Sequence, residues 1–190
     1  MLHENRYIIE YRICGKLRLD LRSLEKTLIK RFPYPKFYQF ADSISHITLV
    51  PPITQNITKT FIMKSIREEF KTFKSFEFKM AQYAFFDNEN RKPIFVNVNF
   101  NRDFIKVRRK LLNRLKKKVE IIDEYENEGF NPHITLGFTE QKRTAKVIVN
   151  FLNKNHPIEA KQSLDRVTLL NSYKILWEYN INKRKLSSRT

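Results

Sequence analysis

Cysteine and glycine are scarce in this chain of 190 residues, and their scarcity excludes several kinds of site. Because Cys14 is the single cysteine, no disulfide can form within the chain, and this fits a reducing compartment. The three glycines, Gly15, Gly129 and Gly137, lie too far apart for the glycine-rich loops that bind phosphates or dinucleotides. The sequence also has no Gly-x-Ser-x-Gly, which excludes the nucleophile turn of the serine hydrolases.

Long apolar segments and metal-binding motifs are absent as well. No apolar run approaches the roughly 18 residues that a membrane-spanning helix requires. Residues 1–6 lack the apolar region of a signal peptide, so we expect a cytoplasmic protein that does not enter the membrane. There is no His-Glu-x-x-His sequence, and with one cysteine a zinc site is not expected. We therefore expect neither a metal ion nor another cofactor.

The charge of the chain is strongly of one sign, because 37 Lys and Arg residues against 20 Asp and Glu give a net +17. Such an excess attracts polyanions, most commonly nucleic acid. One basic run, residues 106–118, is typical of a solvated helix face, and we expect its charges to point away from the functional site. A second basic segment, residues 182–190, is expected to fray as a disordered tail.

The tetrapeptide His-Ile-Thr-Leu occurs twice, at residues 46–49 and 133–136, and uses two of the four histidines in the chain. Its β-branched residues and alternating apolar positions predict that each copy is a strand. Side chains two residues apart share a strand face, so each His and Thr should point to one side, away from the core. The repeat therefore predicts one site, built from His46, Thr48, His133 and Thr135.

The spacing of 87 residues between the two motifs extends to the segments around them. Residues 7–13 align without gaps with residues 94–100, and both segments begin 39 residues before their histidine. A helical pattern follows each first strand, a second helix follows each motif, and another strand ends each half. These pairs of segments are 17–28 and 104–119, 61–70 and 147–152, and 76–80 and 163–169, with an added strand at 174–181.

This order of elements, β-α-β-α-β twice with one more strand, predicts an α+β fold. We expect two pseudo-symmetric lobes, each an antiparallel sheet with two helices, around a central cleft that both motifs face. The length suits a single bilobal domain over residues 1–181, with repeat halves at about 6–86 and 93–181. We expect the protein to be a monomer.

Two imidazoles at one site suit the acid–base cleavage of a phosphodiester. Free histidine has a pKa of about 6.5, so near neutral pH one ring can accept a proton while another donates one. The threonine hydroxyls can donate hydrogen bonds to phosphoryl oxygens, where negative charge must be held. The repeated His-x-Thr spacing therefore predicts a phosphodiesterase that works without a metal ion.

The duplicated His-hydrophobic-Thr-hydrophobic motif in a chain of this length resembles the two-histidine phosphoesterase superfamily. The opening strand at 7–13, the Phe-Asn-Pro sequence at 130–132 and the closing strands extend the similarity over nearly the whole chain. The chain is most similar to the branch of 2′-5′ RNA ligases and RNA 2′,3′-cyclic phosphodiesterases, and its ending resembles archaeal members. The resemblance implies a catalytic set of His46, Thr48, His133 and Thr135, and RNA ends or short oligonucleotides as partners.

The reaction that the resemblance implies is the opening of a terminal 2′,3′-cyclic phosphate on RNA to a 2′-phosphate, with weak reverse 2′-5′ ligation. Family analogy makes His46 the acid and His133 the base, although the symmetry of the motifs does not distinguish them. Two alternatives stay open. The protein can be a phosphodiesterase for 2′-5′ oligonucleotides or small cyclic nucleotides, or an RNA-end binding module with little turnover.

Four further residues are candidates for binding the substrate. Many bacterial relatives have an arginine shortly after the second motif, where this chain has Gly137 and Phe138. Phe138 can stack on a base or belong to the core. Arg91 and Lys92, in a polar turn between the halves, can grip RNA or simply be solvated. Arg12 lines the site if it lies on the strand face that the motifs use.

Overall fold

Two antiparallel sheets form the centre of the protein in the computed structural model, which describes residues 7–39, 44–53, 57–119, 121, 130–172 and 174–187. Within these residues, one sheet has the strand order β2-β1-β7-β8-β9 and the other has the order β5-β4-β3-β6. In chain order the elements are β1 (Tyr7–Arg12), α1 (Gly15–Arg31), β2 (His46–Ile53), α2 (Lys59–Phe70), β3 (Phe76–Phe85), β4 (Lys92–Phe100), α3 (Arg102–Lys116), β5 (His133–Thr139), α4 (Lys142–Asn155), β6 (Lys161–Leu164), β7 (Arg166–Asn171), β8 (Lys174–Asn180) and β9 (Lys185–Ser187).

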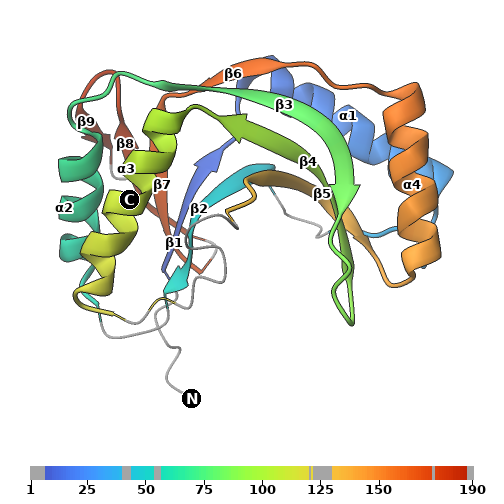
Figure 1. The fold of residues 1–190 in the computed structure, drawn as a ribbon, viewed down its shortest axis with the longest axis horizontal. Helices are drawn as coiled ribbons and strands as arrows, with labels where there is room; N and C mark the ends of the chain where they lie inside the picture. Colours follow the sequence, from blue (N-terminus) through green and yellow to red (C-terminus); the bar gives the residue numbers. More distant parts are fainter. Residues whose placement is uncertain are drawn as a thin grey trace.

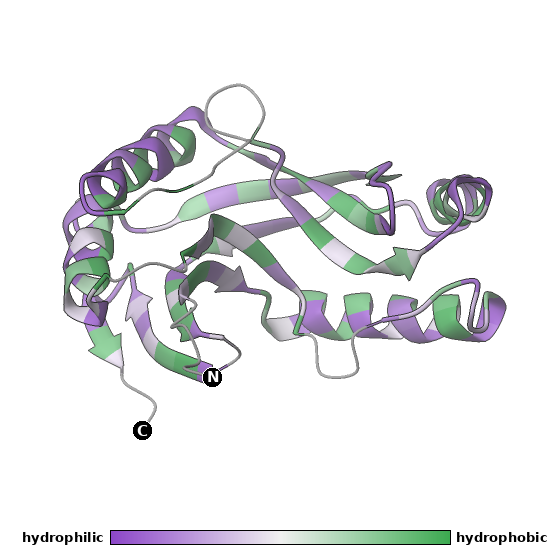
Figure 2. Ribbon diagram, turned by 90° about the horizontal axis from the view of Figure 1, so that it is seen from below, coloured by the Kyte–Doolittle hydropathy of each residue, from purple (hydrophilic) through white to green (hydrophobic). Residues whose placement is uncertain are grey.

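The helices cover the outer sides of an arch that the two sheets form (Figure 1). Helix α4 contacts β3, β4 and β5, and α1 also contacts β5. On the other side, α2 packs against α3, and α3 contacts β2. Hydrophobic and hydrophilic residues alternate along the helices (Figure 2), as expected for helices with one buried face. In the part of the chain that the structure describes, no helix is long and apolar enough to cross a membrane.

Helix α3 illustrates how the sequence pattern produces these elements. The Asn101 side chain accepts a hydrogen bond of 2.9 Å from the Phe104 backbone N–H and so caps the first turn. Phe104, Leu111 and Leu115 recur at helical spacing and are buried. Each such side chain stabilises the fold by about 1.5–3 kcal/mol when it leaves water.

The two sheets do not coincide with the two halves of the sequence repeat. Strand β3 of the first half pairs with β4 of the second half, and β7 of the second half pairs with β1 of the first. The helices cross over in the same way, because α1 contacts β5 and α3 contacts β2. Each lobe therefore contains elements of both halves.

Two segments near the C-terminus differ from their sequence-based predictions. The single strand expected at 163–169 is two strands in different sheets, since β6 pairs with β3 while β7 pairs with β1. The chain changes sheet at Asp165, whose carbonyl accepts a hydrogen bond of 2.8 Å from the Ile181 N–H. In the expected tail at 182–190, Lys185–Ser187 instead form β9, which pairs with β8. Residues 188–190 lie outside the described residues.

The gapless alignment of the first strands is wrong by two residues. Arg12 pairs with His46, whereas Asn97 pairs with His133, so Asn97 and not Asn99 is the counterpart of Arg12. A shift of two residues keeps every side chain on its own face of a strand. For that reason β1 and β4 still present the expected faces to the motifs.

Each motif strand has a bulge directly after its threonine. In β5, Thr135 pairs with Phe95 and Gly137 with Ile94, so Leu136 is an extra residue. In β2, Thr48 pairs with Glu10 and Val50 with Ile9, which leaves Leu49 extra in the same way. Beyond the bulge, side chains again point alternately to the two faces of the sheet. Because one residue has been added, each points to the face opposite to the one expected by counting from the histidine.

The bulge determines where Phe138 lies. Phe138 pairs with Pro93, which is two residues before Phe95 on β4 and shares its face. Because Phe95 pairs with Thr135, Phe138 lies on the same face as the motif side chains. Simple alternation from His133 would have put Phe138 on the core side.

Gly137 leaves room for the segment that precedes β2, and this generates a first prediction. A Cβ atom at this position would contact the Phe37 ring and lie 2.8 Å from the Tyr38 carbonyl oxygen. Tyr38 also exchanges two backbone hydrogen bonds with Phe138, of 3.0 and 2.8 Å. We expect Gly137→Ala to lower the free energy of unfolding by about 1–3 kcal/mol in urea denaturation, as overpacking does.

The matched control is Glu140→Ala, at an exposed position directly after β5, which should leave the free energy of unfolding nearly unchanged. Wild-type stability of Gly137→Ala would mean that the segment at 37–38 moves away without loss.

Candidate active site

The two motifs are anchored in the core by their apolar residues and carry their polar residues on the opposite strand face. Ile47, Leu49, Ile134 and Leu136 expose 1% or less of their surface. The histidines and threonines of the two motifs are only partly buried. The alternation predicted for both motifs is therefore present in the structure.

Both imidazoles are held by the same hydrogen bond. His46 Nδ1 lies 2.8 Å from the Ile44 carbonyl oxygen, and His133 Nδ1 lies 2.8 Å from the Asn131 carbonyl oxygen. A carbonyl only accepts, so Nδ1 must carry a proton in both rings. In the neutral ring Nε2 is then the unprotonated nitrogen, which can accept a proton, and in the charged ring Nε2 can donate one.

A carboxylate lies beside His46. Glu10 exposes only 4% of its surface, and one of its oxygens lies 3.9 Å from His46 Nε2. Its other oxygen accepts a hydrogen bond of 2.7 Å from Arg12 Nε. Glu10 pairs with Thr48 and Arg12 with His46, so these four side chains share one face. Arg12 thus lies on the face predicted for it, where it binds Glu10.

His133 has apolar surroundings instead. The ring centres of Phe86 and Phe95 lie 5.0 and 4.9 Å from the centre of its imidazole. Burial lowers the pKa of His133 below the ordinary value of 6.5, the hydrogen bond to the Asn131 carbonyl opposes this, and the charge of His46 adds to the lowering. Phe95 occupies the register position of Glu10, because Phe95 pairs with Thr135 as Glu10 pairs with Thr48.

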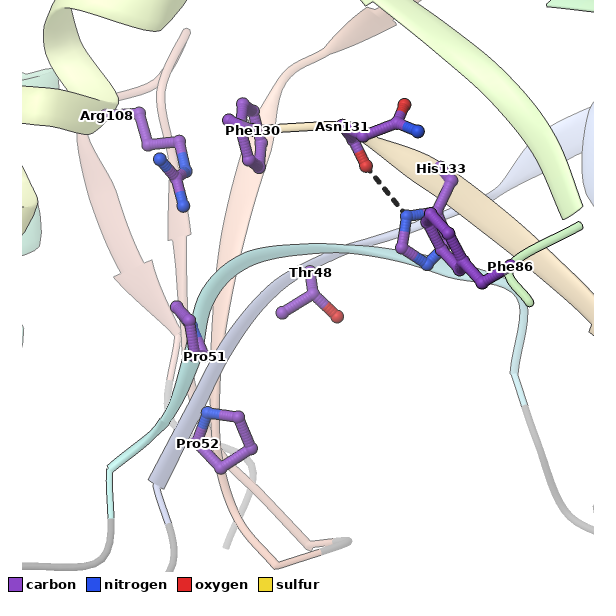
Figure 3. Close-up of a pocket in the computed structure, with 8 residues that line it drawn as sticks. All are labelled: Thr48, Pro51, Pro52, Phe86, Arg108, Phe130, Asn131 and His133. Carbon is purple, nitrogen blue, oxygen red and sulfur yellow. Dashed lines mark hydrogen bonds between the residues drawn. The ribbon is translucent and has the colours of Figure 1, made fainter. Parts of the chain in front are cut away.

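A cavity of about 220 Å³ is lined by one residue of each motif, whereas His46 and Thr135 are not among its lining residues. Thr48 of the first motif and His133 of the second both face this space (Figure 3). Figure 3 also shows the dashed hydrogen bond from His133 to the Asn131 backbone. The cavity is lined by Thr48, Pro51, Pro52, Phe86, Arg108, Phe130, Asn131 and His133.

Arg108 is a cavity residue that sequence reasoning missed. It belongs to the basic run at 106–118, whose charges were expected to face solvent, yet it exposes only 4% of its surface. Its Nε donates a hydrogen bond of 2.8 Å to the Leu49 carbonyl, and its guanidinium carbon lies 3.6 Å from the centre of the Phe130 ring. Arg108 follows Val107 and precedes Leu111 by three residues on the buried side of α3. That helical spacing is the signal that could have identified it.

The polar turn between β3 and β4 presents Arg91 but not Lys92. Lys92 belongs to β4, exposes 7% of its surface, and donates hydrogen bonds to the backbone carbonyls of Asn88 and Glu89. These bonds tie Lys92 to the turn, so it is not placed to grip RNA as predicted. Arg91 is exposed, and its guanidinium carbon lies 5.9 Å from the centre of the Phe138 ring.

The polar groups of the site suit proton transfer and anion binding. They are the imidazoles of the two motifs, the Thr48 hydroxyl, one carboxylate and the guanidinium groups of Arg12 and Arg108, while Thr135 lies on the same strand face as His133. Among the described residues, no group of three or more His, Cys, Asp or Glu side chains could hold a metal ion.

Several solved structures have a similar fold at low sequence identity. TT0787 of Thermus thermophilus has a TM-score of 0.63 at 13% identity, with 93% of this chain and 98% of that chain covered. E. coli LigT in its apo form has a TM-score of 0.56 at 11% identity, covering 98% and 95%. Usb1 of Kluyveromyces marxianus has a TM-score of 0.58 at 9% identity, covering 92% and 98%. The predicted α+β class is confirmed as a LigT-like fold with two antiparallel sheets and, in the described residues, four helices.

Sequence comparison identifies the family. No curated protein matches the sequence. The sequence profile described as the 2′-5′ RNA ligase superfamily matches residues 18–174, a span that includes both His-Ile-Thr-Leu motifs. This chain therefore belongs to the 2′-5′ RNA ligase superfamily of two-histidine phosphoesterases.

Proposed function

We propose that this protein opens the terminal 2′,3′-cyclic phosphate of RNA to a 2′-phosphate without a metal ion. The observation that carries the proposal is a pair of identically oriented imidazoles in opposite surroundings. One imidazole lies beside the carboxylate of Glu10, and the other contacts the rings of Phe86 and Phe95, which pack against each other with centres 4.2 Å apart. Hydrolysis of a cyclic phosphate needs one group that donates a proton and one that accepts a proton. The unlike surroundings of the two rings support giving them these different roles.

In this proposal His133 is the general base. Its lowered pKa keeps the ring neutral near pH 7, with Nε2 free to take a proton from water. The water oxygen attacks phosphorus as that proton moves to Nε2. Because the ring gains charge in the step, the hydrogen bond from Nδ1 to the Asn131 carbonyl also becomes stronger.

His46 is then the general acid. The carboxylate of Glu10, 3.9 Å from Nε2, supplies a counter-charge for a protonated ring. The bond between phosphorus and O3′ breaks as His46 gives its proton to O3′, which leaves a 3′-hydroxyl and a 2′-phosphate. Thr48 and Thr135 donate hydrogen bonds to the two oxygens of the phosphoryl group that do not react. The same steps with a 5′-hydroxyl in place of water form a 2′-5′ linkage, which is the weak ligation activity.

RNA ends are the proposed substrate for two further reasons. The net charge of +17 attracts a polyanion, and the buried guanidinium of Arg108 adds positive charge at the wall of the cavity. Usb1 of Kluyveromyces marxianus, which has a similar fold with a TM-score of 0.54 at 10% identity, has been solved with uridine monophosphate. A nucleotide end is thus the ligand class that the charge and the family support together.

One assay tests this proposal against its alternatives. The enzyme is incubated with a short RNA that ends in a 2′,3′-cyclic phosphate, with a 2′-5′-linked oligonucleotide, and with a free nucleoside 2′,3′-cyclic phosphate. We expect the first to be converted to a 2′-phosphate with the highest kcat/KM. Preference for either of the other substrates would identify a different phosphodiesterase, and tight binding of the RNA without conversion would identify a binding module.

The two histidines give the second prediction. His46→Ala and His133→Ala should each lower kcat by about 10²- to 10⁴-fold, since each removes one proton-transfer group. The double variant should be scarcely slower than the slower single variant, because the two groups act as a unit. His156→Ala, at the end of α4 and outside the cavity lining, is the matched control and should retain the wild-type rate. A near wild-type rate in either single variant at the site would exclude the assignment.

The third prediction concerns pH. Since the base must be neutral and burial lowers the pKa of His133, the acidic limb of kcat/KM should lie below pH 6.5. Phe86→Ser admits water beside the ring, so it should raise that pKa and move the acidic limb to higher pH. Phe61→Ser, at a partly buried position on α2 outside the cavity lining, should leave the limb in place. An unmoved limb in Phe86→Ser would mean that the limb belongs to another group.

The fourth prediction concerns metal ions. Because the proton transfers and charge stabilisation are assigned to side chains, exhaustive treatment with EDTA should leave kcat/KM for the cyclic phosphate within about twofold of its untreated value. The measurement is repeated after adding back Mg²⁺, Mn²⁺ or Zn²⁺. Loss of activity that one of these ions restores would show that the acid–base mechanism is incomplete.

A further inference from the structure

Three aromatic side chains form a row beside the end of the second motif strand. The Phe138 and Tyr38 rings are stacked, with centres 5.9 Å apart and an angle of 28° between their planes. The Tyr34 ring meets Tyr38 edge-on, with centres 6.3 Å apart. We call Phe138, Tyr38 and Tyr34 the aromatic row.

The aromatic row is continuous with the active site. Phe138 lies on the same sheet face as Pro93, Phe95 and Thr135, because of the bulge at Leu136. Phe95 in turn contacts the His133 ring. Apolar side chains thus lead from the second imidazole along β4 and β5 to Phe138, and from there to the two tyrosines.

The row is not part of the hydrophobic core. Tyr34 is 79% exposed, while Tyr38 and Phe138 are partly buried. The backbone nevertheless holds the row in place, since Tyr38 and Phe138 exchange two hydrogen bonds of 3.0 and 2.8 Å. Phe37 beside them exposes only 1% and packs over Gly137. Tyr34 is therefore presented to solvent beside a segment whose backbone is held by hydrogen bonds.

Positive charge accompanies the row. The Arg91 guanidinium carbon lies 5.9 Å from the centre of the Phe138 ring. Lys36 is exposed in the turn between the two tyrosines, where its backbone N–H donates to the Pro33 carbonyl over 3.0 Å. Exposed aromatic rings together with cations are the means by which proteins bind single-stranded nucleic acid without sequence preference.

We propose that the aromatic row binds bases of single-stranded RNA on the 5′ side of the terminal nucleotide. The proposal rests on the function proposed above, which places the 3′ end of the RNA between the two histidines. All other nucleotides then lie on the 5′ side. The cavity of about 220 Å³ is smaller than the roughly 300–1,000 Å³ of common ligand pockets, so these nucleotides extend over its rim. The exposed face of Tyr34 offers them a stacking surface.

Fluorescence anisotropy with 5′-labelled RNA tests this inference. Two single-stranded RNAs with a 2′-phosphate end, a dinucleotide and an octanucleotide, are titrated with the intact protein. We expect the octanucleotide to bind more tightly than the dinucleotide. Tyr34→Ser should lower the ratio of the two affinities by about tenfold, which is the lower part of the range for one stacked base. Tyr34→Phe keeps the ring and should restore the wild-type difference between the two lengths.

The matched control is Leu19→Ser, which removes another exposed apolar side chain, 67% exposed on α1, and should leave both affinities unchanged. Tyr38→Leu is a second test of the row and should reduce the same difference. An unchanged difference in Tyr34→Ser, or one that Tyr34→Phe reduces equally, would overturn the stacking role. Lack of turnover by the wild-type protein would contradict the proposed function instead, because the affinities are measured on product-ended RNA and need no turnover.

Discussion

The chemistry of the site depends on one hydrogen bond that occurs twice, from a histidine Nδ1 to the backbone carbonyl two residues earlier. This bond selects the tautomer and leaves Nε2 as the nitrogen that can exchange a proton. The carbonyl is positioned by the backbone that enters each motif strand, and that backbone is anchored by the buried Ile and Leu of the motif. The apolar half of His-Ile-Thr-Leu is therefore as necessary to the geometry as the polar half.

The two histidines are held in the same way but have different neighbours: one register position differs, and Phe86 also contacts His133. Opposite the first threonine lies Glu10, and opposite the second lies Phe95. A carboxylate supplies a counter-charge for a protonated ring, whereas a phenyl ring excludes water and favours a neutral one. The difference lies on β1 and β4, outside the repeated tetrapeptide. In the mechanism proposed above, this difference between β1 and β4 is what assigns one copy of the duplicated motif the role of acid and the other the role of base.

Local periodicity explains what could be predicted from the sequence. The motif strands, their faces and the helices follow from patterns of two and of three to four residues, which a single segment contains. Two features depend on pairing between distant segments, and a third depends on how one side chain turns within its own loop; none of them could be predicted in this way. The bulge at Leu136 moves Phe138 to the other face, and Asp165 divides one apolar stretch between two sheets. Lys92 lies in a polar turn by sequence but turns its ammonium group back onto the carbonyls of that turn. Arg108 differs from these, since its spacing on α3 indicated burial although its charge suggested solvent.

The exchange of strands between the halves explains why the motifs and the aromatic row lie together. Among the described strands, β2 and β5 come first in their sheet orders, so each motif lies on an edge strand, and the two edges contact one another. An edge strand has backbone groups that can pair with further chain. On β5, the segment that leads from α1 to β2 takes this position through Tyr38 and Phe138. The same strand order that brings the two motif strands into contact thus leaves an edge beside the second motif. This edge holds Tyr38 and the exposed Tyr34 next to the proposed path of the RNA.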